Sequence, residues 1–132
     1  MTLTTGRIRE QPAWLGTVFD RIICGVDGTE SSNVAVAQAM RLLRARRILE
    51  LISVVERGPG GGAGRIDSAD LERHYDEARR ALHDARAQCP RARSAILFGD
   101  AGPVLVAAAR EAGATLVAVG ARAGGRLGGF VL

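Results

Sequence analysis

The feature that most constrains the fold of this chain is a regular alternation between short apolar runs and longer segments with helical periodicity. The apolar runs occupy residues 21–26, 47–55, 92–98 and 115–119. The first and the last are apolar on both faces, which is typical of parallel strands covered by helices. Strands that alternate with helices in this way form parallel sheets with right-handed crossovers. The sequence therefore predicts an α/β fold: a Rossmann-like, doubly wound parallel sheet between two helix layers.

Three segments between these runs have the periodicity of amphipathic helices. The first begins in the polar stretch 29–33 and runs to about Arg44, the second runs from Ser68 to Pro90, and the third has Pro103 in its first turn and Gly113 as its stop. We expect Ser31 and Ser32 to act as helix caps. The predicted inward faces comprise, in chain order, Ala35, Ala39, Leu42 and Leu43; Leu71, Tyr75, Ala78, Leu82, Ala85 and Cys89; and Leu105, Ala108, Ala109 and Ala112.

Length and composition favour one cytoplasmic domain. The 132 residues suffice for a single core, which we place at 19–132 behind an N-terminal tail of residues 1–18. No run is long enough to span a bilayer, and the start of the chain lacks the layout of a signal peptide. The glycine-rich segment 58–64 is predicted to be a flexible loop, and Glu50 to mark a more exposed edge strand. The two cysteines do not form a disulfide framework.

The charge pattern excludes some partners and ligand sites. The net charge of +4 comes from arginine, because the chain contains no lysine, and a P-loop requires one. The arginines are scattered among acids and aromatic residues are few, so we expect neither nucleic acid nor membrane as a partner. His74 and His83 lie nine residues apart on one predicted helix, which turns them to opposite faces, so no metal site is predicted.

The predicted ligand site lies where the strand order reverses, between the first and fourth strands. Asp27 closes the first strand, and Gly120 closes the fourth before a segment rich in glycine and arginine. A nucleoside with phosphates fits this pair: the carboxylate could accept from ribose hydroxyls or an adenine edge, while main-chain N–H groups and arginines hold phosphate. Asp27 is equally well explained as a turn residue before Gly28.

Three motifs resemble the universal stress protein family over residues 20–132: Val26-Asp27-Gly28, Gly99-Asp100, and Leu116-Val-Ala-Val-Gly-Ala-Arg122. The ATP-binding branch of that family has a glycine, two residues, a second glycine, nine residues, and then Gly-Ser or Gly-Thr. Gly120 matches the first glycine, Ala123 replaces the second, and the chain stops at Leu132, just before the expected Gly-Ser. The family's fifth strand, used in dimer contacts, would come later still. We therefore expect a truncated chain with strand order 3-2-1-4 and the fifth strand missing.

The resemblance implies a stress-response protein that binds ATP, with or without Mg²⁺, and acts by ligand-dependent conformation or association. We expect no enzyme activity beyond weak nucleotide hydrolysis, and a homodimer at full length. The alternative is a dimeric interaction module of the same family that binds no nucleotide. The expected site comprises Gly25, Val26, Asp27 and Val54 for base and ribose, and Gly120, Ala121, Arg122, Ala123, Gly124, Gly125 and Arg126 for phosphate.

Overall fold

The computed structural model describes residues 20–43, 47–56 and 67–120, and the main chain of 130–131. The expected N-terminal tail and the glycine-rich loop at 58–64 lie outside these residues. The elements, in chain order, are β1 (Arg21–Gly25), α2 (Glu30–Leu42), β2 (Ile48–Val55), α3 (Ser68–Gln88), β3 (Arg93–Phe98), α4 (Ala101–Ala112), β4 (Leu116–Ala118) and β5 (Phe130–Val131).

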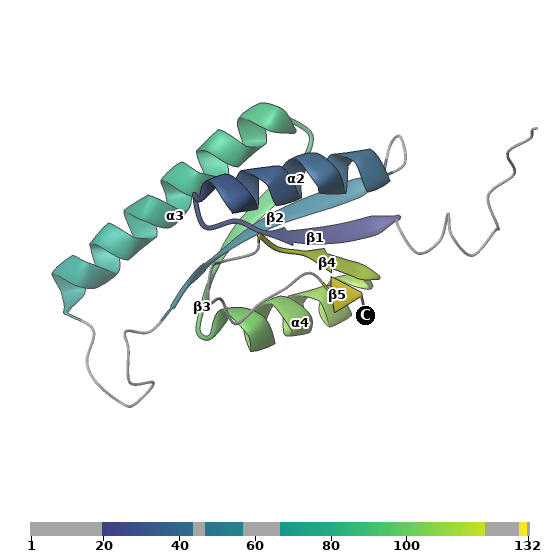
Figure 1. Cartoon of the computed structure of the whole chain (residues 1–132). Helices are drawn as coiled ribbons and strands as arrows, with labels where there is room; N and C mark the ends of the chain where they lie inside the picture. Colours follow the sequence, from purple (N-terminus) through teal and green to yellow (C-terminus); the bar gives the residue numbers. More distant parts are fainter. Residues whose placement is uncertain (1–19, 44–46, 57–66, 121–129, 132) are drawn as a thin grey trace, which may run out of the picture.

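The sheet has the order β3-β2-β1-β4-β5 (Figure 1). β1 pairs in parallel with β2 and with β4, and β2 pairs in parallel with β3. The α/β fold and the parallel order 3-2-1-4 are confirmed. The interpretation of Glu50 as the mark of an edge strand is wrong, because β2 lies between β1 and β3.

The fourth strand is not the edge of the sheet, contrary to the expectation that no strand would follow it. β5 pairs antiparallel with β4, so that Leu116 faces Val131 and Val117 faces Phe130. Only residues 119–129 separate the two strands, too few for the helical crossover that a parallel neighbour requires. A short returning strand satisfies main-chain groups that an edge would otherwise leave exposed.

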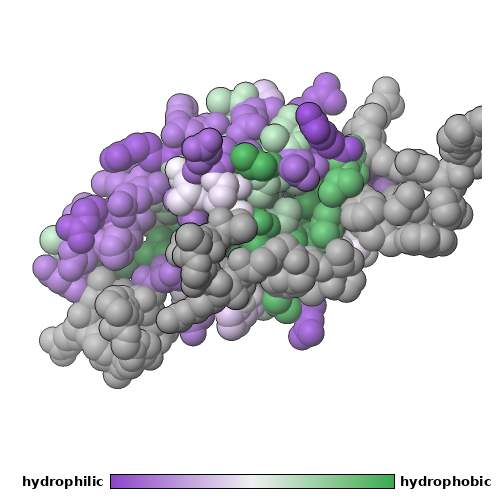
Figure 2. Space-filling model, viewed as in Figure 1, coloured by the Kyte–Doolittle hydropathy of each residue, from purple (hydrophilic) through white to green (hydrophobic). Residues whose placement is uncertain are grey.

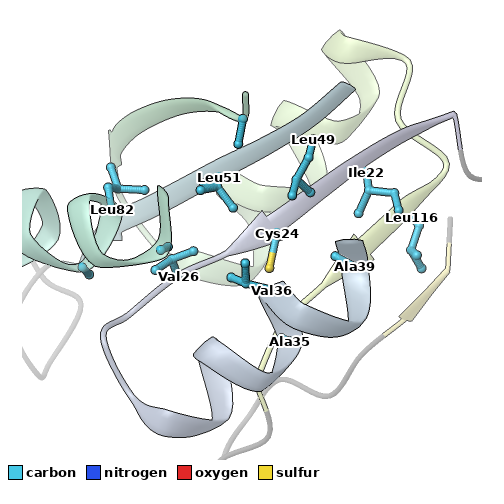
Figure 3. Packing of buried hydrophobic residues seen from close by; sticks show 13 residues of the cluster. Ile22, Cys24, Val26, Ala35, Val36, Ala39, Leu49, Leu51, Leu82 and Leu116 are labelled. Carbon is cyan, nitrogen blue, oxygen red and sulfur yellow. The ribbon is translucent and has the colours of Figure 1, made fainter. Parts of the chain in front are cut away.

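Helices cover both faces of the sheet. Figure 1 shows α2 and α3 on one face and α4 on the other. Alternate side chains of β1 divide between the two layers: Ile22 and Cys24 pack beneath α2 and α3 (Figure 3), and Ile23 packs against α4. Because successive side chains of a strand point to opposite faces of the sheet, each face has its own hydrophobic core.

The buried face of α2 comprises Ser32, Ala35, Val36 and Ala39. The prediction that Leu42 points inward is wrong, because its side chain is 47% exposed. The helix ends at Leu42 and the main chain becomes extended at the next residue, Leu43, which packs against the core instead. Because the backbone changes direction after Leu42, the side chain of Leu43 reaches the core and that of Leu42 faces solvent.

The predicted inward face of α3 is buried only in its second half. Ala78, Leu82 and Ala85 are buried, whereas Leu71 and Tyr75 are 38% and 40% exposed. Figure 1 shows the first part of α3 projecting beyond the sheet, and at the border Tyr75 stacks on Phe98, the last residue of β3.

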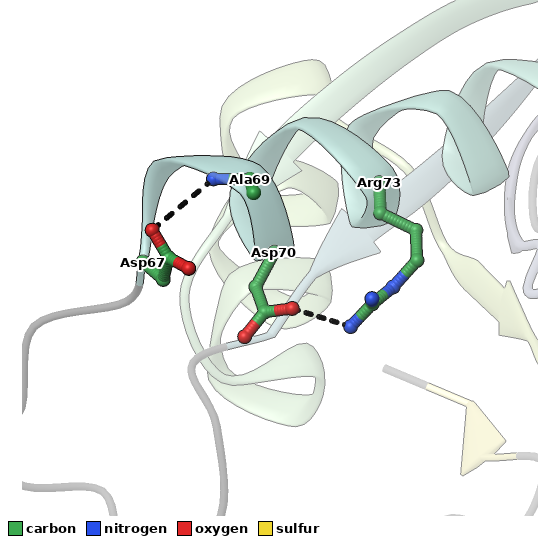
Figure 4. A network of polar contacts seen from close by, with 4 residues as sticks. All are labelled: Asp67, Ala69, Asp70 and Arg73. Carbon is green, nitrogen blue, oxygen red and sulfur yellow. Dashed lines mark hydrogen bonds and ion pairs between the residues drawn. The ribbon is translucent and has the colours of Figure 1, made fainter.

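Local polar contacts hold the projecting start of α3 in place (Figure 4). Asp67 Oδ1 accepts from the main-chain N–H of Ala69 at 3.4 Å, and Arg73 Nη2 forms an ion pair with Asp70 Oδ1 at 2.6 Å. A side-chain cap and an i,i+3 pair stabilise helix ends without tertiary packing. The first turn of α3 is therefore stabilised by the helix's own residues.

Candidate functional site

The candidate site lies at the carboxyl ends of β1 and β4, which are neighbours in the sheet. The last residue pair in their register is Cys24 with Ala118. Beyond it the two chains stay close, since a Cβ built on Gly25 would lie 3.1 Å from Val119 Cγ1. β2 lies on one side of β1 and β4 on the other. The site is therefore the point where the strand order reverses, as predicted.

Gly120 lies directly against the first turn of α2. A Cβ built on it would be 2.5 Å from the main-chain N of Ser32, 2.6 Å from the carbonyl C of Ser31 and 2.7 Å from Ser31 Oγ. Any side chain here would collide with main-chain atoms, so the close approach requires glycine. The contact fixes the start of the glycine-arginine segment at the N-terminal, partly positive end of a helix.

Asp27 forms the turn between β1 and α2, so the turn interpretation is confirmed. Its Oδ1 accepts from the main-chain N–H of Thr29 at 3.0 Å and from Thr29 Oγ1 at 2.6 Å. Gly28, between them, has a φ of 82°, which favours glycine. The Asp27 side chain is exposed at the end of β1. Asp27 can therefore hold the turn through Oδ1 and still present its carboxylate to a ligand.

Thr29, and neither of the two serines, caps α2. Its Oγ1 accepts from the main-chain N–H of Ser32 at 3.2 Å, because Thr29 is the extended residue just before the helix. Ser32 is 2% exposed, and its Oγ accepts from the main-chain N–H of Asp27 at 3.3 Å. Ser31 Oγ lies 3.2 Å from Thr29 Oγ1. The prediction of Ser31 and Ser32 as caps is thus wrong, and the role of Ser32 in holding the turn was missed.

The apolar residues predicted for the site lie at the carboxyl ends of β1 and β2. Val26 is 3% exposed and packs beneath α2, and its N–H donates to Ile52 O at 2.8 Å. Val54 is half-buried on the α4 side. Gly25 gives room to Leu105, whose Cδ1 would lie 2.9 Å from an added Cβ. Gly25 and Val54 are therefore partly accessible to a ligand, whereas the Val26 side chain belongs to the core.

The remaining predicted phosphate contacts lie outside the described residues and stay predictions. They are Ala121, Arg122, Ala123, Gly124, Gly125 and Arg126.

The ionisable groups near the core offer no metal cage and no thiolate. Among residues 20–43, 47–56 and 67–120, no three His, Cys, Asp or Glu side chains are grouped so that they could hold a metal ion. Burial raises the pKa of the Cys24 thiol to about 12, so this cysteine stays protonated and unreactive. In the same part of the chain, no helix is both long and apolar enough to cross a membrane.

Comparison with solved structures identifies relatives of the same architecture. A universal stress protein family member from Burkholderia pseudomallei has 27% identity and a TM-score of 0.67, over 80% of this chain and 83% of that chain. The hypothetical protein MJ0577 has 12% identity and a TM-score of 0.65, over 76% and 73% of the two chains. A universal stress protein in complex with cAMP has 22% identity and a TM-score of 0.54, over 75% of this chain and 74% of that chain.

None of the curated proteins compared with this chain matches it. The universal stress protein family model, however, matches residues 19–132. This span includes every described element, and the relative with 27% identity has the same fold. The chain therefore belongs to the universal stress protein family.

Proposed function

We propose that this protein binds an adenine nucleotide, ATP foremost, at the carboxyl ends of β1 and β4. It acts through ligand-dependent conformation or association, with weak hydrolysis at most. The observation that carries the proposal is the contact of Gly120 with the first turn of α2. A relative with the same fold was solved with cAMP, which is also an adenine nucleotide.

The base and ribose would lie against Gly25, Val26 and Val54, with the Asp27 carboxylate accepting from ribose hydroxyls or from the adenine amine. Val26 N–H already donates to Ile52 O, so this main chain would contribute its carbonyl. The exposed Asp27 side chain provides the polar contact that orients the ligand.

The phosphates would lie against Gly120 and the arginines that follow it. The positive end of α2 favours an anion, although the first turn also carries the acidic Glu30. Arg122 and Arg126 would offset that negative charge and supply charge-assisted hydrogen bonds to phosphate. A bound Mg²⁺ would reduce repulsion among the phosphates.

The same contact suggests how ligand binding would reach the rest of the fold. Gly120 touches main-chain atoms of α2, so a ligand that pulls the following segment inward must move or tighten that helix. Packed main chain transmits small displacements because it has no soft side chain to absorb them. The resulting change in α2 is the proposed signal.

Titration calorimetry on Asp27 variants tests the proposal. Asp27→Asn keeps an amide oxygen for the turn but loses the carboxylate, whereas Asp27→Ala loses both. Losing one charge-assisted hydrogen bond costs about 1.5 to 3 kcal/mol, so both variants should bind ATP roughly tenfold or more weakly. Only Asp27→Ala should also lower the unfolding free energy, by about 1 kcal/mol. Wild-type affinity in folded Asp27→Asn would contradict the ligand role.

The same titration separates phosphate contacts from base contacts. Arg126→Ala should weaken ATP more than adenosine, since only ATP carries phosphate. Arg110→Ala, an exposed arginine in the last turn of α4, is the matched control and should change neither affinity. Equal losses for ATP and adenosine in Arg126→Ala would refute the proposed role of Arg126.

The second candidate function is a dimeric interaction module that binds no nucleotide. The observation that favours it is the engagement of Asp27 Oδ1 by Thr29, which gives the carboxylate a structural role. Absence of ATP binding by wild-type protein, together with a homodimer in sedimentation, would establish this alternative. Homodimerisation and a cytoplasmic location are proposals under either function.

A further inference from the structure

We propose that the outer edge of β3 and the adjoining face of α3 bind an acidic, extended segment of a partner protein, which adds to the sheet as a further strand. This surface lies at the β3 edge of the sheet and is separated by β2 from β1 and the candidate nucleotide site. Its proposed activity does not depend on nucleotide.

β3 offers unpaired main-chain groups along one side. It is the terminal strand of the sheet and pairs only with β2 among the described strands. Gly99 N–H donates to Val55 O at 3.1 Å, so alternate residues point their main-chain groups away from β2. By this alternation, the N–H and C=O of Ser94, Ile96 and Phe98 face outward. Such an edge is a template for an added strand.

A positively charged groove runs beside this edge. Its volume is about 1030 Å³, and its charged lining comprises Arg79, Arg80 and Arg86, with Asp76 as the one carboxylate. Asp76 lies 3.7 Å from Arg79. Within the part of the chain that the structure describes, no carboxylate lies within ion-pair distance of Arg80 or Arg86. Figure 2 shows hydrophilic side chains gathered over this region of α3.

An aromatic pair lies at the carboxyl end of the same edge. The rings of Tyr75 and Phe98 stack, with centroids 6.3 Å apart and an angle of 10° between their planes. Phe98 is 57% exposed and Tyr75 is 40% exposed. Leu71, one helical turn before Tyr75, is also exposed. An apolar side chain at one end of the partner segment would be buried here.

These features together favour an acidic peptide over other occupants. Only a peptide main chain can pair in register with successive N–H and C=O groups of a strand edge. A second copy of this chain would place the arginines of one groove close to those of the other, which like-charge repulsion opposes. Glutamates on the α3 side of an added strand would instead meet Arg80 and Arg86.

Fluorescence anisotropy with a labelled peptide, Glu-Val-Glu-Val-Glu-Val-Leu, tests the charge requirement, because strand alternation places its glutamates and its leucine on the same face. Binding should weaken as salt rises, because exposed charges are screened. The double variant Arg80→Glu/Arg86→Glu should weaken binding about tenfold or more. Arg41→Glu/Arg110→Glu makes the same charge change on α2 and α4 and should bind as the wild type does. Equal binding of a peptide with lysine in place of glutamate would overturn the proposal.

A proline substitution tests strand addition itself. Ser94→Pro removes an outward N–H without removing a hydrogen bond to β2, a position where edge strands tolerate proline. It should reduce peptide affinity about tenfold or more, whereas Ser94→Ala, which keeps the N–H, should not. Thermal unfolding and circular dichroism check that both variants are folded. Unchanged affinity in folded Ser94→Pro, or tighter binding of an oligothymidylate of equal charge, would refute strand addition.

Discussion

The starts of α2 and α3, on the same face of the sheet, differ in how closely they pack against the rest of the fold. At the start of α2, Gly120 lies against the main chain of the helix, and Ser32 and Val36 are buried. At the start of α3, Leu71 and Tyr75 remain exposed, and polar contacts within the helix hold it. A substitution in the first region must displace main chain, whereas one in the second changes only a surface. The first is therefore suited to couple a ligand to the fold, and the second to bind a partner without disturbing it.

The largest expected effect contrasts the two halves of α3. Leu82 is 6% exposed and packs on the sheet, so Leu82→Ala should lower the unfolding free energy by about 3 kcal/mol. Leu71→Ala makes the same change in the projecting half and should alter stability by less than about 0.5 kcal/mol. Urea denaturation monitored by circular dichroism measures both. Similar losses in the two variants would show that the start of α3 is covered.

A smaller loss of stability is expected when glycine is replaced at Gly120, which is in close contact, or at Gly113, which has a positive φ. Gly120→Ala forces a Cβ into main-chain atoms of α2 and should destabilise the fold by about 2 to 3 kcal/mol. Gly113 has a φ of 69° and nothing within 4 Å of an added Cβ, so Gly113→Ala should lose only about 1 kcal/mol, from backbone strain. Denaturant midpoints compare the two. An equally small loss for Gly120→Ala and Gly113→Ala would contradict a rigid contact between Gly120 and the main chain of α2.

The smallest effect at neutral pH concerns Cys24, in the core beneath α2. Its pKa is raised from 9.0 to about 12 in the folded protein by burial, so its contribution is complete below pH 9 and is lost as pH rises toward 12. The unfolding free energy should fall by up to about 1.4 kcal/mol per pH unit in that window. Cys24→Ala should remove this slope, whereas Cys89→Ala, at the half-buried end of α3, should keep it. Parallel pH profiles for wild type and Cys24→Ala would rule out a buried titrating thiol.

The sequence predicted the main architecture because strand and helix periodicities are local. The alternation of apolar runs predicted the parallel order, and Gly113 was correctly identified as the stop of α4. The sequence did not predict β5, because a strand of two residues is too short to show a periodic pattern. The sequence also did not predict that Leu71 and Tyr75 would be exposed, because helical periodicity does not indicate where the sheet under a helix ends.

The sequence predicted where Asp27 and Gly120 lie in the fold, whereas their role in binding a ligand stays a prediction. Asp27 and Gly120 emerge at the same edge because adjacent parallel strands end together. Ser32 was predicted to be a cap because a hydroxyl at a helix start can have several roles. The hydrogen bonds show that Thr29 caps the helix and that Ser32 contacts the turn. The requirement for glycine at position 120 comes from a contact with residues far away in sequence, which no local pattern records.

Two-dimensional NMR of the amide groups during ATP titration tests the central claim most directly. We expect the largest shift changes at Gly25, Asp27, Gly120 and the first turn of α2, with little change at Ser94, Ile96 and Phe98 on the β3 edge. Adenosine should shift Gly25 and Asp27 but leave Gly120 less affected, because it lacks phosphate. ATP-induced changes confined to α3 and β3, or none anywhere, would contradict a nucleotide site at the junction of Gly120 with α2.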